Sequence, residues 1–237
     1  MNANYQFQLP KIITYPFLVV SLSILISVGF FVAELNNVVR YGVLTLSLVL
    51  GLGYLAIYLL IRNFTNLDRR IKDRDFLLKQ IPWKGNEKVL DVGCGNGILI
   101  LSAAKQLTTG HAIGVDMWTE NSGNNTKEVF ESNAALEGVQ DKVEIHSEDA
   151  RQLPYENNSF DVVLCGLTMH HLLHDKGAER AINEIIRVLK PNGFLAIYDV
   201  PIAILSTQKM LRKKQVKLER LNSKILFGVK LGKSQVN

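Results

Sequence analysis

The chain has 237 residues, of which 47% are hydrophobic, and its formal net charge is +5. This length is enough for one α/β domain with an addition. Two cysteines, Cys94 and Cys165, exclude a cysteine-rich metal site and a disulfide framework, which is typical of a reducing compartment. The positive charge is concentrated in the tail, where residues 205–237 hold nine Lys or Arg residues and one acid, Glu219. The remainder is slightly acidic, so the chain does not have a uniformly basic coat.

The first part of the chain holds most of the hydrophobic excess. Residues 12–33 and 41–61 are two runs without a charge, and a helix needs about 20 apolar residues to cross a bilayer. The pattern predicts a transmembrane hairpin over residues 1–61. A cleaved signal peptide or buried core helices are the alternatives. Basic residues after the second run, beginning with Arg62, place the large domain that follows and both termini in the cytoplasm.

Residues 62–86 alternate apolar and charged positions at near-helical spacing. We expect an amphipathic linker helix that ends at Pro82. Its basic residues could meet anionic headgroups, or its apolar side could pack on the domain that follows. The third segment, residues 87–237, is expected to fold as one large domain.

A strand, a glycine turn and a helix are predicted where that domain begins. Val89, Leu90 and Val92 form a short apolar run that Asp91 interrupts, and a helical pattern begins at Ile98. Between them stand three alternating glycines: Gly93, Gly95 and Gly97. Such a corner binds anions and nucleotides, because glycines allow close approach and the helix start offers free N–H groups. The third glycine comes one residue early for a dinucleotide loop, and the Gly-Lys-Ser/Thr of a P-loop is absent.

The segment V-L-D-V-G-C-G-N-G resembles motif I of class I S-adenosylmethionine-dependent methyltransferases, in the methyltransferase type 11 group. Two later segments, L-P-Y-x-x-x-S-F-D-V-V and R-V-L-K-P-N-G, are similar to the same family and stand in the same order. The resemblance covers about residues 75–200. It implies an α/β fold with a Rossmann-like, doubly wound and mostly parallel sheet, and S-adenosyl-L-methionine as cofactor. It also implies cofactor contacts from the motif I residues, which are Asp91, Gly93, Cys94, Gly95 and Gly97.

Acids follow the next two predicted strands. Residues 111–116 form a strand ending in Asp116, and a carboxylate at that place in nucleotide-binding folds accepts hydrogen bonds from ribose hydroxyls. Met117 and Trp118 could pack on the adenine, although Trp118 could equally be an ordinary surface or core aromatic. After the strand 142–147, the resemblance implies that Asp149 and Ala150 contact the adenine. It also places Cys165, which ends the strand 160–165, among the cofactor-binding residues.

His170 and His171 follow that fourth strand. In open α/β sheets the ligand crevice lies at the carboxyl ends of the strands, so this pair is expected to face the reacting group. One histidine could act as a general base, with His171 slightly ahead of His170. The alternative is that both pack against or cap the next helix. His174 lies close by in sequence, but no carboxylate motif accompanies the cluster, and no metal is expected.

The chain beyond Asp199 departs from the family pattern. A helix is predicted over residues 202–214 and strands over residues 216–221 and 225–231. The family closes its sheet with a sixth strand and an antiparallel seventh. Whether this chain completes that edge stays open at this point, as does its oligomeric state.

The leading functional hypothesis is a membrane-anchored methyltransferase that moves a methyl group from S-adenosylmethionine to a small-molecule or lipid-like acceptor. A non-catalytic S-adenosylmethionine-binding scaffold at the membrane is the alternative. The glycine spacing disfavours a nicotinamide dehydrogenase. The basic tail alone does not indicate a nucleic-acid methylase, because no Asn/Asp-Pro-Pro-Tyr motif is present.

Overall fold

The structure is a computed structural model, and it describes residues 3–5, 18, 21–22, 24–25, 28–29, 37–119, 125–174 and 176–232. The chain separates into two compact units. One unit comprises Met1–Tyr5 and Ile71–Asn237, and the other comprises Gln6–Arg70. The predicted division at residues 61/62 and 86/87 remains a prediction.

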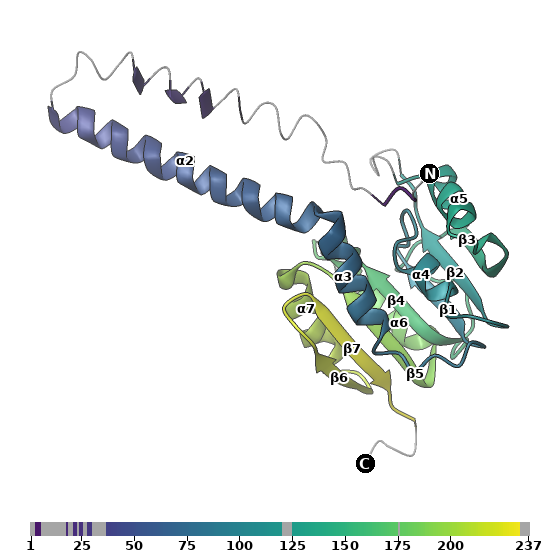
Figure 1. Cartoon of the computed structure of the whole chain (residues 1–237). Coiled ribbons are helices and arrows are strands. Elements are labelled where there is room, and N and C mark those ends of the chain that lie inside the picture. Colours follow the sequence, from purple (N-terminus) through teal and green to yellow (C-terminus); the bar gives the residue numbers. More distant parts are fainter. Residues whose placement is uncertain are drawn as a thin grey trace. The chain divides into compact units, whose positions relative to one another are not determined.

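Within the described residues of the larger unit, seven strands form one sheet in the order β3-β2-β1-β4-β5-β7-β6 (Figure 1). The first five strands pair in parallel, whereas β7 runs antiparallel to both of its neighbours. Their bounds are β1 (Lys88–Val92), β2 (His111–Asp116), β3 (Val143–Ser147), β4 (Phe160–Gly166), β5 (Leu189–Tyr198), β6 (Val216–Arg220) and β7 (Ile225–Lys230). The sheet confirms the predicted Rossmann-like α/β fold, and β6 and β7 complete its C-terminal edge.

Helices cover both faces of this sheet (Figure 1). The described helices are α2 (Asn37–Thr65), α3 (Leu67–Leu78), α4 (Ile100–Ala104), α5 (Lys127–Leu136), α6 (Gly177–Val188) and α7 (Pro201–Leu211), with short 3-10 helices η2 (Gln140–Lys142) and η3 (Met169–Leu172). Successive side chains of a strand point to opposite faces. Leu90 and Val92 of β1 join the hydrophobic cluster that α6 and α7 complete. Asp91, between them, accepts the N–H of Ile100 in α4, so α4 lies on the opposite face.

The connection into β5 differs from the expected tight turn. The predicted strand begins at Phe194, but in the structure β5 begins at Leu189, which pairs with Phe160. The pairing then shifts register and resumes between Val162 and Phe194. Asn192 has a φ of 63° within the intervening stretch, which explains the asparagine there, because asparagine tolerates the left-handed region. The residues of the expected tight turn are therefore part of β5, where they form an irregular segment between Leu189 and Phe194.

The linker also differs from its predicted bounds. Helix α2 continues through Thr65, and α3 begins at Leu67 after a break at Asn66. The side-chain oxygen of Asn66 accepts the N–H of Arg69, as an N-cap residue does. The helix ends at Leu78, before the predicted stop at Pro82. The Asn66 cap therefore separates α2 from α3, whereas the apolar spacing predicted one continuous helix.

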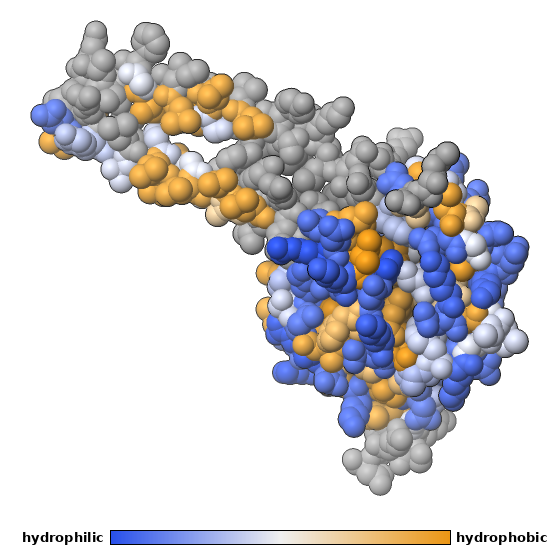
Figure 2. Space-filling view, in the orientation of Figure 1, coloured by the Kyte–Doolittle hydropathy of each residue, from blue (hydrophilic) through white to orange (hydrophobic). Residues whose placement is uncertain are grey.

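Helix α2 exposes many apolar side chains, including Val38, Leu46 and Leu48 (Figure 2). Even so, none of the helices in the described ranges combines the length and the apolarity that crossing a membrane requires. This finding corrects the predicted two-span membrane localisation. The prediction rested on a count of uncharged residues along the sequence. Most of the first run, residues 12–33, lies outside the described residues.

Candidate active site

The three glycines of the turn after β1 all have positive φ angles, at +76°, +51° and +89° for Gly93, Gly95 and Gly97. At Gly93 a side chain is also excluded by lack of space, because a Cβ atom would lie 2.0 Å from Oγ1 of Thr168. The N–H groups of Gly93 and Cys94 donate to the carbonyl of Val115 at 2.8 and 3.0 Å. The end of β2 therefore fixes the turn in the shape that the motif predicted.

Asp91 lies beneath this turn and is 1% exposed. Its Oδ2 atom accepts the N–H of Ile100 at 3.2 Å, whereas its buried Oδ1 atom has no hydrogen-bond partner among the described residues. Burial raises the pKa of Asp91 to about 7, and the nearby Asp116 carboxylate also raises it, against the effect of the Ile100 N–H. A buried carboxylate oxygen without a partner is suited to a ligand with a hydrogen-bond donor or a positive charge.

Asp116, at the end of β2, is joined to the glycine turn. Its Oδ2 atom accepts the N–H of Gly95 at 2.9 Å, and its Oδ1 atom accepts the N–H of Trp118 at 3.1 Å. Each carboxylate oxygen can accept further hydrogen bonds. The glycine turn and the predicted ribose ligand thus form one hydrogen-bonded unit. Trp118 has a φ of 39°, its ring lies under Nζ of Lys127, and Met117 is 53% exposed.

The predicted adenine contacts lie at the next strand end. The N–H of Glu148 donates to the carbonyl of Asp116 at 3.2 Å, so the loop after β3 adjoins the end of β2. Arg151 binds both carboxylate oxygens of Asp149 through its guanidinium, at 2.7 and 2.9 Å. This hydrogen bonding holds the pKa of Asp149 below its usual range. Ala150 is half-buried beside it and packs against the hydrophobic core.

Both cysteines are buried, and their thiols face the protein rather than open space. Sγ of Cys94 lies beside Gly114 of β2, where a Cβ atom would approach it to 2.8 Å. Cys165 belongs to the hydrophobic core cluster. Burial raises the pKa of both thiols. Cys94 can therefore contribute to a cofactor site only through its backbone, and Cys165 packs in the hydrophobic core.

The two predicted catalytic histidines lie in η3, directly after β4. Thr168, which precedes η3, donates its hydroxyl to the carbonyl of Gly166 at 3.0 Å and lies 3.4 Å from the carbonyl of Gly93. The ring centroids of His170 and His171 are 3.9 Å apart. Contact between Thr168 and Gly93 thus brings the histidine segment next to the glycine turn.

A residue that we did not predict, Asp199, completes this arrangement. It follows β5 and is fully buried, and its Oδ1 atom lies 2.7 Å from Nδ1 of His170. It also accepts the backbone N–H groups of His170 and Val200. The rule that selected Asp116, an acid at the carboxyl end of a buried strand, also selects Asp199. No sequence pattern indicated Thr168, because its role depends on a contact with Gly93, which lies 75 residues away in the sequence.

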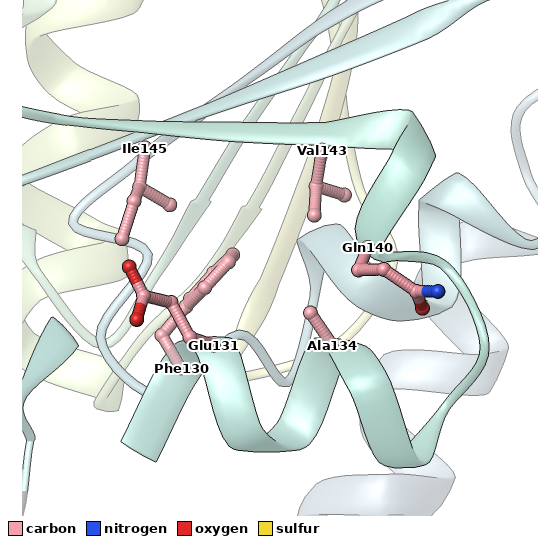
Figure 3. A pocket seen from close by; sticks show the side chains of 6 residues that line it. All are labelled: Phe130, Glu131, Ala134, Gln140, Val143 and Ile145. Carbon is pink, nitrogen blue, oxygen red and sulfur yellow. The ribbon is translucent and has the colours of Figure 1, made fainter. Parts of the chain in front are cut away.

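One pocket lies elsewhere, between α5 and the edge strand β3 (Figure 3). Its volume is about 260 Å³. Its lining comes from α5, η2 and β3: Phe130, Glu131, Ala134, Gln140, Val143 and Ile145. The predicted cofactor residues do not line it, so it is separate from the site at the glycine turn.

The site fits S-adenosylmethionine. The glycine turn provides close backbone approach, Asp116 retains acceptor capacity, and Asp91 has a buried oxygen without a partner among the described residues. Asp91 and the glycine turn would hold the amino-acid part of the cofactor, and Asp116 would hold its ribose.

Comparisons with known proteins agree with this fit. Residues 90–197, just under half of the chain, match the family model described as a methyltransferase domain. The chain is 30% identical over 140 residues to a demethylmenaquinone methyltransferase of Lactobacillus johnsonii, covering 58% of this chain and 53% of that protein. It is 33% identical over 135 residues to the 27-O-demethylrifamycin SV methyltransferase of Amycolatopsis mediterranei, covering 55% and 44%.

A solved structure shows the same fold. The SAM-dependent methyltransferase from Aquifex aeolicus superposes with a TM-score of 0.55 at 23% identity, covering 71% of this chain and 94% of that one. The chain spans about half the length of the curated relatives that it matches. Residues 90–197 are thus similar to the methyltransferase domain family, and the described part of the chain has the fold of the Aquifex aeolicus methyltransferase.

Proposed function

We propose that this protein transfers a methyl group from S-adenosylmethionine to a small-molecule acceptor, with His170 as general base. The observation that carries this proposal is the 2.7 Å contact between Nδ1 of His170 and the buried carboxylate of Asp199. A surface histidine that only caps a helix has no need of a fully buried carboxylate. The contact of Thr168 with Gly93 supports a position for this pair beside the cofactor turn.

The pair can remove a proton from an acceptor. An ionised carboxylate only accepts hydrogen bonds, so Nδ1 of His170 carries the hydrogen and Nε2 has a lone pair available. When bound, the cofactor supplies an electrophilic methyl group. The proton that the acceptor atom loses on methylation would move to Nε2 of His170. Fixing His170 in one orientation favours this step, because correct geometry lowers the barrier.

His171 has a different part in this proposal. Partial desolvation of its ring and the neighbouring His170 lower its pKa. The lowered pKa favours the neutral form of His171, so this ring adds little positive charge beside His170. The sequence pattern slightly favoured His171 as the base, and the contact with Asp199 leads us to propose His170 in its place.

A base is needed only when the acceptor atom carries a proton at the working pH. We therefore propose an acceptor with a hydroxyl group or an acidic carbon. The relatives named above include a demethylmenaquinone methyltransferase and a 27-O-demethylrifamycin SV methyltransferase. Their names support a small organic acceptor, and the proposal extends to a lipid-like one such as a quinone precursor.

Incubation with methyl-labelled S-adenosylmethionine and a small-molecule extract tests the proposal. The wild-type protein should transfer label to a product that mass spectrometry can identify. The variant His170→Ala should bind cofactor but transfer label at least about 100-fold more slowly, since a general base contributes about 10²–10⁴-fold. His174→Ala, an exposed histidine of the same segment, is the matched control. Cofactor binding without any transfer would instead favour the non-catalytic scaffold.

A further inference from the structure

The N-terminal segment, residues 3–5, lies against α5 in the same compact unit. Asn133 of α5 forms two hydrogen bonds with the backbone of Asn4. Its Oδ1 atom accepts the N–H of Asn4 at 2.6 Å, and its Nδ2 atom donates to the carbonyl of Asn4 at 3.0 Å. The side-chain amide thus pairs with the segment as a second peptide group would.

Asn133 also reaches the glycine turn. Its Nδ2 atom donates to the carbonyl of Asn96 at 2.9 Å, and the side chain is only 1% exposed. An amide has one acceptor oxygen and two donor hydrogens. All of them are used here, two on Asn4 and one on Asn96. Asn133 therefore connects the N-terminal segment to the turn between Gly95 and Gly97.

A second connection runs through Tyr5, which is 6% exposed. Its hydroxyl donates to Oε1 of Glu137 at 2.9 Å. Glu137 is the C-cap residue of α5, four residues after Asn133, and it forms an ion pair with Lys105. Lys105 caps the C-terminus of α4, the helix that follows the glycine turn. The segment thus contacts α5 directly and α4 through one carboxylate.

We propose that Asn133 is a positioning residue of the S-adenosylmethionine site, which holds the glycine turn through the carbonyl of Asn96, and that docking of residues 3–5 and cofactor binding favour each other. This inference rests on the proposed cofactor site. Its physical basis is that a turn held in one shape does not have to be ordered when the ligand binds. Linkage requires the coupling to be reciprocal, so bound cofactor must also hold the segment in place.

Loss of Asn133 affects the turn in a defined way. Asn133→Leu keeps a side chain of similar size but leaves the carbonyl of Asn96 and both backbone groups of Asn4 without this partner. We expect the Kd for S-adenosylhomocysteine, measured by calorimetry, to rise about tenfold, the effect of about 1.4 kcal/mol. Ser132→Ala, at the exposed neighbouring position of α5, is the control and should stay within about twofold of wild type.

Tyr5→Ala provides a second variant that leaves α5 and the turn unchanged. It removes the buried ring that docks the segment, and the Kd should rise about threefold while circular dichroism remains that of the wild type. Reciprocity is tested on the wild-type chain by chymotryptic cleavage after Tyr5. Saturating S-adenosylhomocysteine should slow this cut at least about threefold.

Several results would overturn the inference. If the wild-type protein binds S-adenosylhomocysteine and both variants bind it equally well, the positioning role is refuted while the proposed function stands. An unchanged cleavage rate after Tyr5 would refute the coupling. Failure of the wild-type protein to bind would refute the cofactor site and this inference together. A merely structural role of Asn133 would lower the unfolding temperature and leave the Kd of the folded variant unchanged.

Discussion

Nδ1 of His170 lies 2.7 Å from Oδ1 of Asp199, a carboxylate without exposure to solvent. The same carboxylate accepts the backbone N–H groups of His170 and Val200, at 3.2 and 2.7 Å. It is therefore fixed on the segment that follows β5, while the imidazole belongs to the segment that follows β4. Two neighbouring strand ends together orient one ring.

Asp199→Asn tests this relationship. The substituted amide keeps the shape but offers an N–H group where His170 needs an acceptor, which favours the wrong tautomer. We expect kcat for methyl transfer to fall about 100-fold, with the Kd for S-adenosylmethionine changed less than about threefold. The double variant with His170→Ala should be no slower than His170→Ala alone. Wild-type kcat in Asp199→Asn would contradict the orienting role.

Gly93→Ala should destabilise the domain for two reasons. The φ of +76° strains any residue with a Cβ atom, and that atom would lie 2.0 Å from Oγ1 of Thr168. Gly138→Ala is a matched control, because Gly138 has a φ of +68° but has no atom within 4 Å of the added carbon. Urea unfolding should show that Gly93→Ala loses about 1–3 kcal/mol more than Gly138→Ala. Equal losses would mean that Thr168 moves aside at no cost.

Asp116→Ala removes one hydrogen bond from the glycine turn, that of the Gly95 N–H group, and one from the segment after β2, that of the Trp118 N–H group. It also removes the proposed ribose ligand. We expect the affinity for S-adenosylmethionine to fall at least about tenfold and the free energy of unfolding to fall by about 1–2 kcal/mol. Calorimetry and urea unfolding measure the two effects separately. Affinity like that of wild type would place the ribose elsewhere.

Asp91 should make the cofactor-free protein less stable as the pH rises. Its folded pKa is raised to about 7 by burial, whereas an unfolded aspartate titrates near about 3.9. Between these values the folded state binds the extra proton, so the free energy of unfolding decreases from about pH 4 to about pH 7. Asp91→Asn does not titrate. The stability of wild type relative to this variant should therefore be greater at pH 5 than at pH 8, and a constant difference would contradict the shift.

Much of the fold was predictable because local patterns determine it. The apolar run Val89–Val92 and the alternating glycines form the strand and turn that their spacing indicates. The sixth and seventh strands were also visible as short apolar runs near the terminus. That they complete the edge of the sheet was not predictable, because this depends on the pairing of β7 with β5, which are separated in the sequence.

Side-chain partnerships account for most of what the sequence did not show. Arg151 binds Asp149 from only two positions away, and nothing in the motif indicates this competing partner. Asp199 follows a strand as Asp116 does, but its partner His170 lies 29 residues earlier in the chain. The membrane prediction rested on a count of uncharged residues, and the described helices contradict it.

The most direct test of the central claim is calorimetric titration of the 237-residue chain with S-adenosylmethionine and, separately, with NADH. The account predicts that the wild-type protein binds S-adenosylmethionine and not NADH. It also predicts that Gly95→Arg abolishes the binding, because Gly95 has a φ of +51° and a long charged side chain would extend from the turn past Asn125, which lies 3.7 Å from an added Cβ atom. Gly138→Ala should bind as the wild type does. Unchanged affinity for S-adenosylmethionine in Gly95→Arg would contradict the assignment of the glycine turn as the cofactor site.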